Sequence, residues 1–111
     1  MKTKEKKVIE LVGEDEPFVS SSLVGNIDVP YKKLVKLLGT PNIGSDGHKV
    51  DAEWNIRVNG KFMSIYNYKD GKVYCGKSGI ATTKLTDWHI GGAENLDAEI
   101  VVLKTLLAEI E

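Results

Sequence analysis

Few of the features that define a function class are present in this sequence. It contains a single cysteine, Cys75, so no disulfide can form within the chain, and this fits a reducing compartment. The 15 Lys and Arg residues nearly balance the 16 Asp and Glu residues, which argues against direct nucleic-acid binding because dedicated binders are usually strongly basic. No apolar run approaches the roughly 20 residues of a membrane span, and none follows the charged start as in a signal peptide. These absences predict an intracellular protein that does not enter a membrane.

The sequence predicts an N-terminal arm over residues 1–20 and a single domain over residues 21–111. The arm begins with lysines and glutamates, contains one apolar run at 8–12, and continues with acidic residues at 14–16. The apolar run suits a short edge strand, and it equally suits a flexible arm that becomes ordered on a partner. Both alternatives stay open at the level of the sequence.

Residues 54–69 predict a β-hairpin around Asn59-Gly60, a dipeptide favoured where two successive residues need positive φ. Such a turn sets the register of the two strands and therefore the faces of their side chains. One face is apolar and is expected to meet the helices; its opposed pairs are Trp54 with Ile65, Ile56 with Met63, and Val58 with Lys61. The other face is polar and aromatic; its opposed pairs are Arg57 with Phe62, Asn55 with Ser64, and Glu53 with Tyr66, and Tyr68 continues it.

Local signals predict the remaining elements. We expect strands at 22–29 and 85–90, with a bulge at Gly25 and a stop at Gly91-Gly92, and a second hairpin that turns at Asp70-Gly71 and returns through 72–75. Apolar residues at helical spacing predict helices at 30–38 and 96–110. The predicted fold is α+β: an antiparallel sheet of four to five strands with two helices on one face, in the order β-α-β-β-β/β-α.

The polar face of this sheet is the surface that we expect to bind a partner. If strand 85–90 lies beside the hairpin, Asp87 and His89 join that face near Arg57 and the tyrosines, while Trp88 and Ile90 enter the core. Aromatic rings mixed with Arg and His suit a protein interface or a homodimer contact, and they also suit a stacked nucleotide. An ordinary solvated face is the third interpretation. The predicted binding residues are Arg57, Phe62, Tyr66, Tyr68, His89, Glu53, Asp87, Lys77 and Ser78.

Signals for catalysis, metals and cofactors are weak. Residues 71–78 match the phosphate-loop pattern GxxxxGKS, but no helix pattern follows, so only a loop that closes on an anion through Lys77 and Ser78 survives. Asp87 and His89 share a strand face as a base pair would, yet no activated nucleophile accompanies them. The histidines His48 and His89, with Asp46 or Asp51, lack metal-ligand spacing. We therefore expect a protein that is not an enzyme and that holds no cofactor or metal.

Four spaced motifs resemble a family of small phage and prophage accessory proteins. They are GxPN at 39–42, KxxxEW at 49–54, IYxYK at 65–69 and WHIGG at 88–92, and the similarity covers residues 38–110. The resemblance implies a counter-defence inhibitor in the cytoplasm of an infected bacterium, which binds and blocks a host immune component such as a CRISPR effector. The alternative that it implies is a protein that sequesters a cyclic-nucleotide immune signal. It carries over no catalytic residue.

Overall fold

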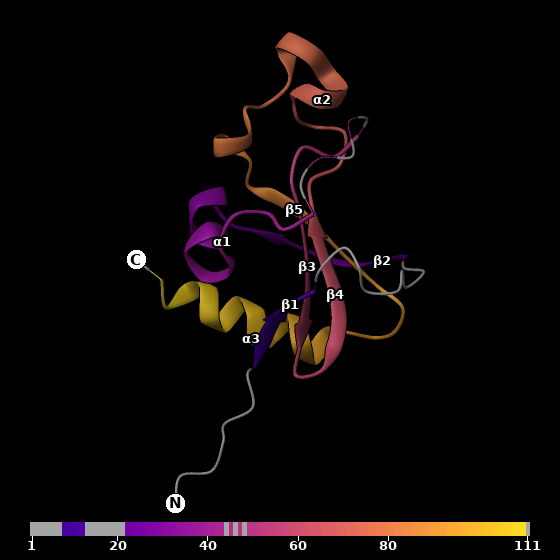
Figure 1. The fold of residues 1–111 in the computed structure, drawn as a ribbon, viewed down its shortest axis with the longest axis vertical. Helices are drawn as coiled ribbons and strands as arrows, with labels where there is room; N and C mark the ends of the chain where they lie inside the picture. The colour runs from indigo at the N-terminus through magenta and orange to yellow at the C-terminus, as the bar shows by residue number, and fades with distance from the viewer. Residues whose placement is uncertain (1–7, 13–21, 44, 46, 48, 111) are drawn as a thin grey trace, which may run out of the picture.

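The computed structural model describes residues 8–12, 22–43, 45, 47 and 49–110 (Figure 1). Five strands form one sheet in the order β1-β3-β4-β5-β2, and every neighbouring pair is antiparallel. The strands are β1 (Ile9–Leu11), β2 (Ser22–Asp28), β3 (Glu53–Val58), β4 (Lys61–Tyr66) and β5 (Asp87–Gly92). The helices are α1 (Tyr31–Leu38), α2 (Lys72–Cys75) and α3 (Asp97–Ala108), with 3₁₀ turns at Gly76–Ser78 and Thr82–Lys84. The predicted α+β class is confirmed, with a third, short helix in addition.

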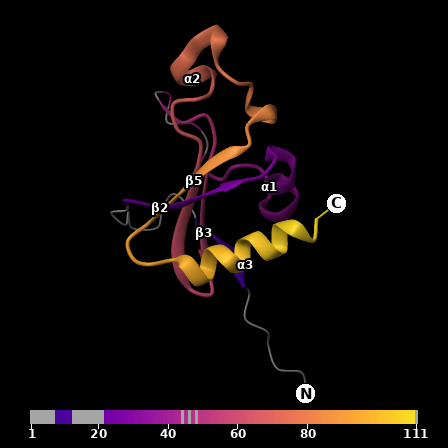
Figure 2. The ribbon, with the colours of Figure 1, turned by 180° about the vertical axis from the view of Figure 1, so that it is seen from behind.

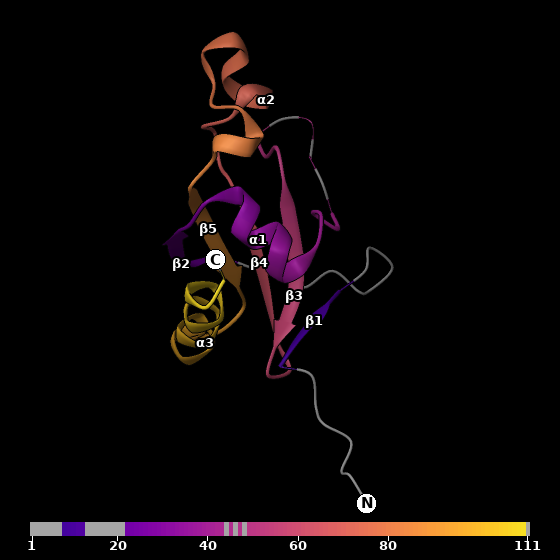
Figure 3. The same cartoon turned by 90° about the vertical axis from the view of Figure 1, so that its left-hand side faces the viewer.

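Helices α1 and α3 lie on the same side of the sheet, as Figures 1 and 3 show from two directions. Their buried leucines, Leu34, Leu38, Leu103 and Leu107, belong to one hydrophobic core with the inward residues of β3, β4 and β5. The sheet therefore has an inner face, which the helices cover, and an outer face that carries the polar side chains.

Within the described residues, no helix is long and apolar enough to cross a membrane.

The central hairpin has the register that the Asn59-Gly60 turn predicts. Trp54 lies opposite Ile65, and all three apolar and all three polar pairs are confirmed. Asn59 and Gly60 have φ values of 50° and 85°, as a turn with two positive-φ residues requires. The alternating burial along β3 follows from this register, because every second side chain faces the helices.

Three aromatic rings, Tyr31, Trp54 and Trp88, meet beneath the helices and are called the inner cluster here. Their ring centroids are 5.5 to 6.2 Å apart. Both indoles are fully buried, and both N–H groups are satisfied: Trp54 Nε1 donates to the Gly39 carbonyl and Trp88 Nε1 to the Val29 carbonyl, each at 2.9 Å. The inner cluster thereby joins α1 to the middle of the sheet.

The two edge strands confirm two further expectations. β1 pairs with β3, so the apolar run at 8–12 contains an edge strand, while residues 1–7 and 13–20 of the predicted arm lie outside the described residues. In β2 the register with β5 shifts between Leu23 and Gly25, which is the predicted bulge. A Cβ at Gly25 would lie 2.8 Å from Ile100 Cδ1, so glycine lets α3 pack directly on this strand.

The predicted second hairpin is wrong, because residues 72–75 form α2 and not a returning strand. The Cys75 N–H donates to the Gly71 carbonyl at 2.9 Å and closes a helical turn, and the Val73 N–H donates to Asp51 Oδ2 at 3.2 Å. No residue of α2 is buried, so no core contact favours an extended strand there. The chain instead leaves the sheet at residue 67 and returns to it at β5.

Strand β5 also extends further than predicted. Gly91 and Gly92 do not end it but pair with Leu23 and Ser22 of β2. A Cβ at Gly92 would lie 2.5 Å from Leu96 Cδ1, so the glycine is needed for the approach of the residue that precedes α3. The sequence also suggests Asn95 as the N-cap of the last helix, but Leu96 takes that position in α3, and Asn95 Oδ1 accepts from the Asp97 N–H at 2.8 Å.

Candidate functional site

A row of polar and aromatic side chains crosses the outer face of the sheet. Glu53 lies opposite Tyr66, Tyr66 opposite His89, and His89 opposite Asn26, on four successive strands. The prediction that His89 joins the tyrosines on this face is therefore confirmed. The row exists because β4 and β5 are neighbours in the sheet, although residues 67–86 separate them in the chain.

Two rings of this row, Tyr66 and His89, form the outer cluster together with the neighbouring ring of Tyr68. Tyr66 and His89 meet edge to face at 5.6 Å, Tyr68 and His89 are tilted at 5.7 Å, and the two tyrosines are 6.5 Å apart. Tyr68 remains 40% exposed. The cluster thus presents part of its aromatic surface to the outside.

Lysine side chains extend the outer cluster towards α2. Lys69 Nζ lies 5.2 Å from the ring centroid of Tyr68 and 5.3 Å from that of Tyr74, and Lys49 Nζ lies 6.0 Å from Tyr68. At these distances an ammonium is attracted by the ring quadrupole, which stabilises an exposed pair by roughly 0.5–1 kcal/mol. Lys69 therefore stands between two exposed rings, since Tyr74 is 49% exposed.

The backbone at Lys69 is held in a left-handed conformation. Its φ is 62°, which is uncommon for a residue with a Cβ and costs on the order of 1 kcal/mol. The Lys69 N–H donates to the Lys49 carbonyl at 2.9 Å, and its carbonyl accepts from Cys75 Sγ at 3.2 Å. Neighbouring groups thus fix the strained residue whose side chain lies between the two rings.

A buried asparagine, which the sequence interpretation missed, positions this region. The fully buried Asn67 accepts from the Asp51 and Ala52 N–H groups at 2.8 and 3.1 Å, and its amide donates to the Asp51 and Asp70 carboxylates at 2.9 Å each. These four bonds are the Asn67 network. The available signal was position, because Asn67 continues the inward alternation of Met63 and Ile65 and a polar residue there needs partners.

Residues 68–84 project from the end of the sheet and are called the protrusion; α2 lies at its tip in Figure 1. It contains Lys69, Lys72, Lys77 and Lys84 against the single acidic residue Asp70, in a chain whose net charge is −1. It also exposes four large apolar or aromatic side chains, Tyr68, Val73, Tyr74 and Ile80. The protrusion is therefore both basic and apolar, a combination suited to binding rather than to solubility alone.

The phenol of Tyr66, in the outer cluster, has a raised pKa. Partial burial raises the pKa of Tyr66 above its ordinary value, and the Glu53 carboxylate and Tyr68 raise it further. A proton on this phenol is therefore held more tightly than on an exposed tyrosine. The ring remains neutral and able to donate a hydrogen bond at physiological pH.

The structure brings only some of the predicted binding residues together. Glu53, Tyr66, Tyr68 and His89 are neighbours, whereas Arg57 lies at the other end of the hairpin, opposite Glu10 and Phe62. The expectation that His89 and Arg57 lie side by side is wrong, because β5 pairs with β4 and not with β3.

The predicted loop residues and the Asp87–His89 pair are also placed. Lys77 and Ser78 lie in the protrusion, where Ser78 Oγ donates to the Cys75 carbonyl at 3.1 Å. No hydrogen bond joins Asp87 to His89 in the described part of the chain, and the His89 ring contacts the tyrosines instead. His48 and Asp46 lie outside the described residues.

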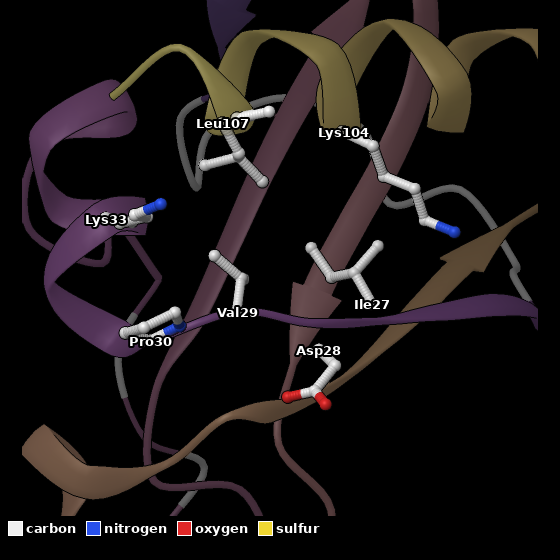
Figure 4. A pocket seen from close by; sticks show the side chains of 8 residues that line it. Ile27, Asp28, Val29, Pro30, Lys33, Lys104 and Leu107 are labelled. Atoms are coloured by element: carbon white, nitrogen blue, oxygen red, sulfur yellow. The ribbon is translucent and has the colours of Figure 1, made fainter. Parts of the chain in front are cut away.

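Two cavities lie away from the outer cluster. One of about 360 Å³ opens between β2, the start of α1 and the end of α3, with Ile27, Val29 and Leu107 on its floor (Figure 4). The other, of about 320 Å³, lies where β2 and β5 meet the start of α3. Neither is lined by a ring of the outer cluster or by a residue of the protrusion.

Comparison with known proteins found no family model, no curated protein and no solved structure that matches this chain.

Proposed function

We propose that the protein is a non-enzymatic binding protein that blocks a component of bacterial immunity, and that its binding surface is the outer cluster together with the protrusion. The counter-defence role in this proposal comes from the resemblance of the four sequence motifs to phage accessory proteins. The location of the surface comes from the side chains described above. The partner is a host defence protein, bound in the bacterial cytoplasm.

The observation that carries the proposal is Lys69 between the exposed rings of Tyr68 and Tyr74. Aromatic anchors next to a cation are the side chains that contribute most to protein interfaces when a partner excludes water from them. Here they stand on a projecting segment with three more lysines and two exposed aliphatic residues, Val73 and Ile80. A partner patch that is acidic at its rim and apolar at its centre fits this surface.

The shape of the surface favours a macromolecule over an enclosed small ligand. Small-molecule sites are concave and bury most of the ligand, whereas Tyr68 and Tyr74 are 40% and 49% exposed. The rings of the outer cluster are open on their outward side. The strained backbone of Lys69 supports the same assignment, because strain of this kind concentrates at functional positions.

A second candidate is the sequestration of a cyclic nucleotide. Exposed tyrosine rings stack on bases, and the lysines around them match phosphate charge. Lys69 Nζ lies 5.2 Å from the ring centroid of Tyr68 and 5.3 Å from that of Tyr74. This arrangement favours the alternative, since one ammonium is close enough to either ring to pair with the phosphate of a base that stacks on it.

The test of the first candidate is a set of bacterial strains, each carrying one defence system and challenged with a phage that the system restricts. The wild-type chain is expected to restore plating in a strain whose defence it blocks, and Lys69→Glu with Tyr74→Ala is expected to abolish that restoration. Lys32→Glu is the matched control, because it reverses an exposed charge on α1. A folded double variant that still restores plating fully contradicts the surface, and a wild type that restores none of the strains contradicts the function.

The second candidate is tested by thermal unfolding with cyclic di- and trinucleotides. A ligand of sub-micromolar affinity at tens of micromolar stabilises the protein by roughly 2–3 kcal/mol, which raises Tm by roughly 8–15 °C in a domain of this size. A shift that Tyr74→Ala removes and Lys32→Glu retains supports sequestration. An unchanged Tm across the whole set contradicts it.

A further inference from the structure

Strand β2 leaves one edge of the sheet open. It is seven residues long, and no other described strand pairs with its second edge. The Val29 N–H donates to the Thr86 carbonyl at 2.8 Å. Because the backbone groups of an antiparallel strand alternate in direction, the N–H and C=O groups of Ile27 and Val29 point towards β5. Those of Asn26 and Asp28 point away from it, towards the open edge. Among residues 22–28 there is no lysine and no proline, the usual protection of an exposed edge. The opposite edge strand, β1, has only three residues.

Helix α3 packs on the inner side of this edge strand, where the two elements lie alongside each other in Figure 2. Asp97, Val101, Lys104 and Ala108 follow one another at helical spacing and form one stripe of the helix. Asp97 lines the cavity at the Ser22 end of β2, and Lys104 and Ala108 line the cavity at its Asp28 end. Glu99, two residues before Val101, faces the other way and pairs with Lys61 of β4 at 3.7 Å. The stripe therefore flanks the open edge along its length.

The middle of this stripe is apolar and exposed. Val101 is 62% exposed, more than any other large hydrophobic residue of the described chain, and Leu23 on β2 is 61% exposed. Leu23 belongs to the edge strand itself, and Val101 lies on the helix that packs against this strand. An apolar contact and a row of hydrogen-bond donors and acceptors are thus available at the same place.

The two ends of the open edge carry opposite charges. Glu94 and Asp97 line the cavity at the Ser22 end. Lys33 of α1 and Lys104 of α3 line the cavity at the other end together with Asp28, so two ammonium groups stand there against one carboxylate (Figure 4). In the described residues, no ion pair joins either lysine to a carboxylate on the same chain. The groups that line the two ends therefore carry a net negative charge where β2 begins and a net positive charge where it ends.

We propose that β2 pairs antiparallel with β2 of a second copy of this chain, which forms a homodimer with one continuous ten-stranded sheet. A two-fold axis near the middle of β2 places the acidic end of one copy against the basic end of the other, so Asp97 meets Lys104 of its mate twice. The same axis brings Val101 of both copies together. A parallel arrangement would oppose like charges, so the charge pattern selects the antiparallel one.

The proposal is tested by sedimentation equilibrium of the full chain from roughly 1 to 200 µM, the range in which modest interfaces dissociate. We expect a mass of twice the 12.2 kDa chain at the upper end. Val101→Asp is expected to give a monomer throughout, because it buries two unpaired carboxylates against each other. Since Val101 is exposed, circular dichroism is expected to show that this variant folds normally.

A charge exchange distinguishes this interface from any other. Lys104→Glu is expected to raise the dimer Kd roughly tenfold, because two symmetry-related attractions become repulsions. Adding Asp97→Lys is expected to restore most of the affinity, whereas Lys84→Glu in the protrusion leaves it unchanged. Asn26→Pro, which removes one outward N–H and keeps every side chain of the stripe, is expected to weaken the dimer as well.

Three results would overturn the proposal. They are a monomer at the highest concentration, a dimer that Val101→Asp and Asn26→Pro leave intact, and a double charge exchange that weakens the dimer further instead of rescuing it. None of these results bears on the outer cluster, because no residue of the proposed interface belongs to it.

Discussion

Two aromatic clusters lie on opposite faces of the same sheet and have nearly the same internal geometry. The inner cluster of Tyr31, Trp54 and Trp88 has ring centroids 5.5 to 6.2 Å apart, and the outer cluster of Tyr66, Tyr68 and His89 has them 5.6 to 6.5 Å apart. Their surroundings differ completely, since helices cover the first and lysines border the second.

The difference teaches that ring geometry does not decide the role of an aromatic cluster. In the inner cluster the polar N–H groups are satisfied by backbone carbonyls, so the rings contribute burial and dispersion to stability. In the outer cluster the rings keep exposed area, which gains free energy only when a partner covers it. The inner cluster therefore stabilises the fold, and the outer cluster supplies a surface that the fold holds in place.

The largest expected effect is on the free energy of unfolding, when a ring of the inner cluster is truncated and compared with an exposed ring beside the outer cluster. Trp54→Ala is expected to destabilise the protein by about 3–5 kcal/mol, because it leaves a cavity in the core. Tyr74→Ala, at an exposed ring, is expected to change the free energy of unfolding by less than about 0.5 kcal/mol. Urea denaturation measures both values, and similar losses for the two variants would contradict the division of roles.

The second expected effect concerns the Asn67 network, which connects the two regions. Asn67→Ala is expected to cost about 2–4 kcal/mol, because it leaves the Asp51 and Ala52 N–H groups without this acceptor and removes the amide donor from two carboxylates. Hydrogen exchange is expected to accelerate at the Asp51 and Val73 amides more than in the middle of β3.

Asn67→Asp serves as the comparison at the same position. It keeps the size and the accepting oxygen but places a third carboxylate beside Asp51 and Asp70. Its loss of stability is expected to equal or exceed that of Asn67→Ala at pH 7. A harmless Asn67→Asp would show that the network does not position the protrusion.

A smaller effect is expected from Lys69→Gly, which separates stability from binding. Glycine adopts positive φ without strain, so the free energy of unfolding is expected to stay equal or to rise by up to about 1 kcal/mol. Binding is expected to fall, because the ammonium between Tyr68 and Tyr74 is lost. Thermal unfolding and the plating assay measure the two sides, and a variant that keeps full activity would remove Lys69 from the proposed surface.

The smallest effect is expected from Tyr66→Phe at alkaline pH. Folding raises the pKa of Tyr66 above its ordinary value of about 10, so the unfolded chain loses this proton first as the pH increases. The contribution to stability is therefore complete below about pH 10 and is lost as the pH rises through the folded pKa. Thermal melts are expected to show equal pH dependence of the two proteins below pH 10 and a shallower loss for Tyr66→Phe above it.

Local sequence signals predicted much of the fold. The Asn59-Gly60 turn, the alternation along β3 and β4, and the apolar stripes of α1 and α3 depend on neighbours a few residues apart, and all of them are confirmed. The prediction of a strand at 72–75 is wrong, because none of these residues packs against the hydrophobic core. Without that burial, a hydrogen bond from Val73 to the distant Asp51 helps to hold a helical turn instead.

The candidate site was predictable in part for the same reason. The register of the hairpin places Glu53 opposite Tyr66, and His89 joins them once β5 lies beside β4. Arg57 was grouped with them because the sequence does not specify how far along the strands the third strand pairs. Asn67, Lys69 and Tyr74 became part of the site only through contacts that cross the turn into α2.

The sequence by itself determined the two faces of the hairpin, the helices that cover one of them, and the α+β class. Alternation and helical periodicity encode these features, because burial of an apolar stripe acts on each element separately. Only the tertiary structure decided the strand order, the helical turn at 72–75 and the neighbours of Tyr68. These depend on hydrogen bonds and packing between residues far apart in the chain, whose free energies exceed the weak local preferences of the segments that they join.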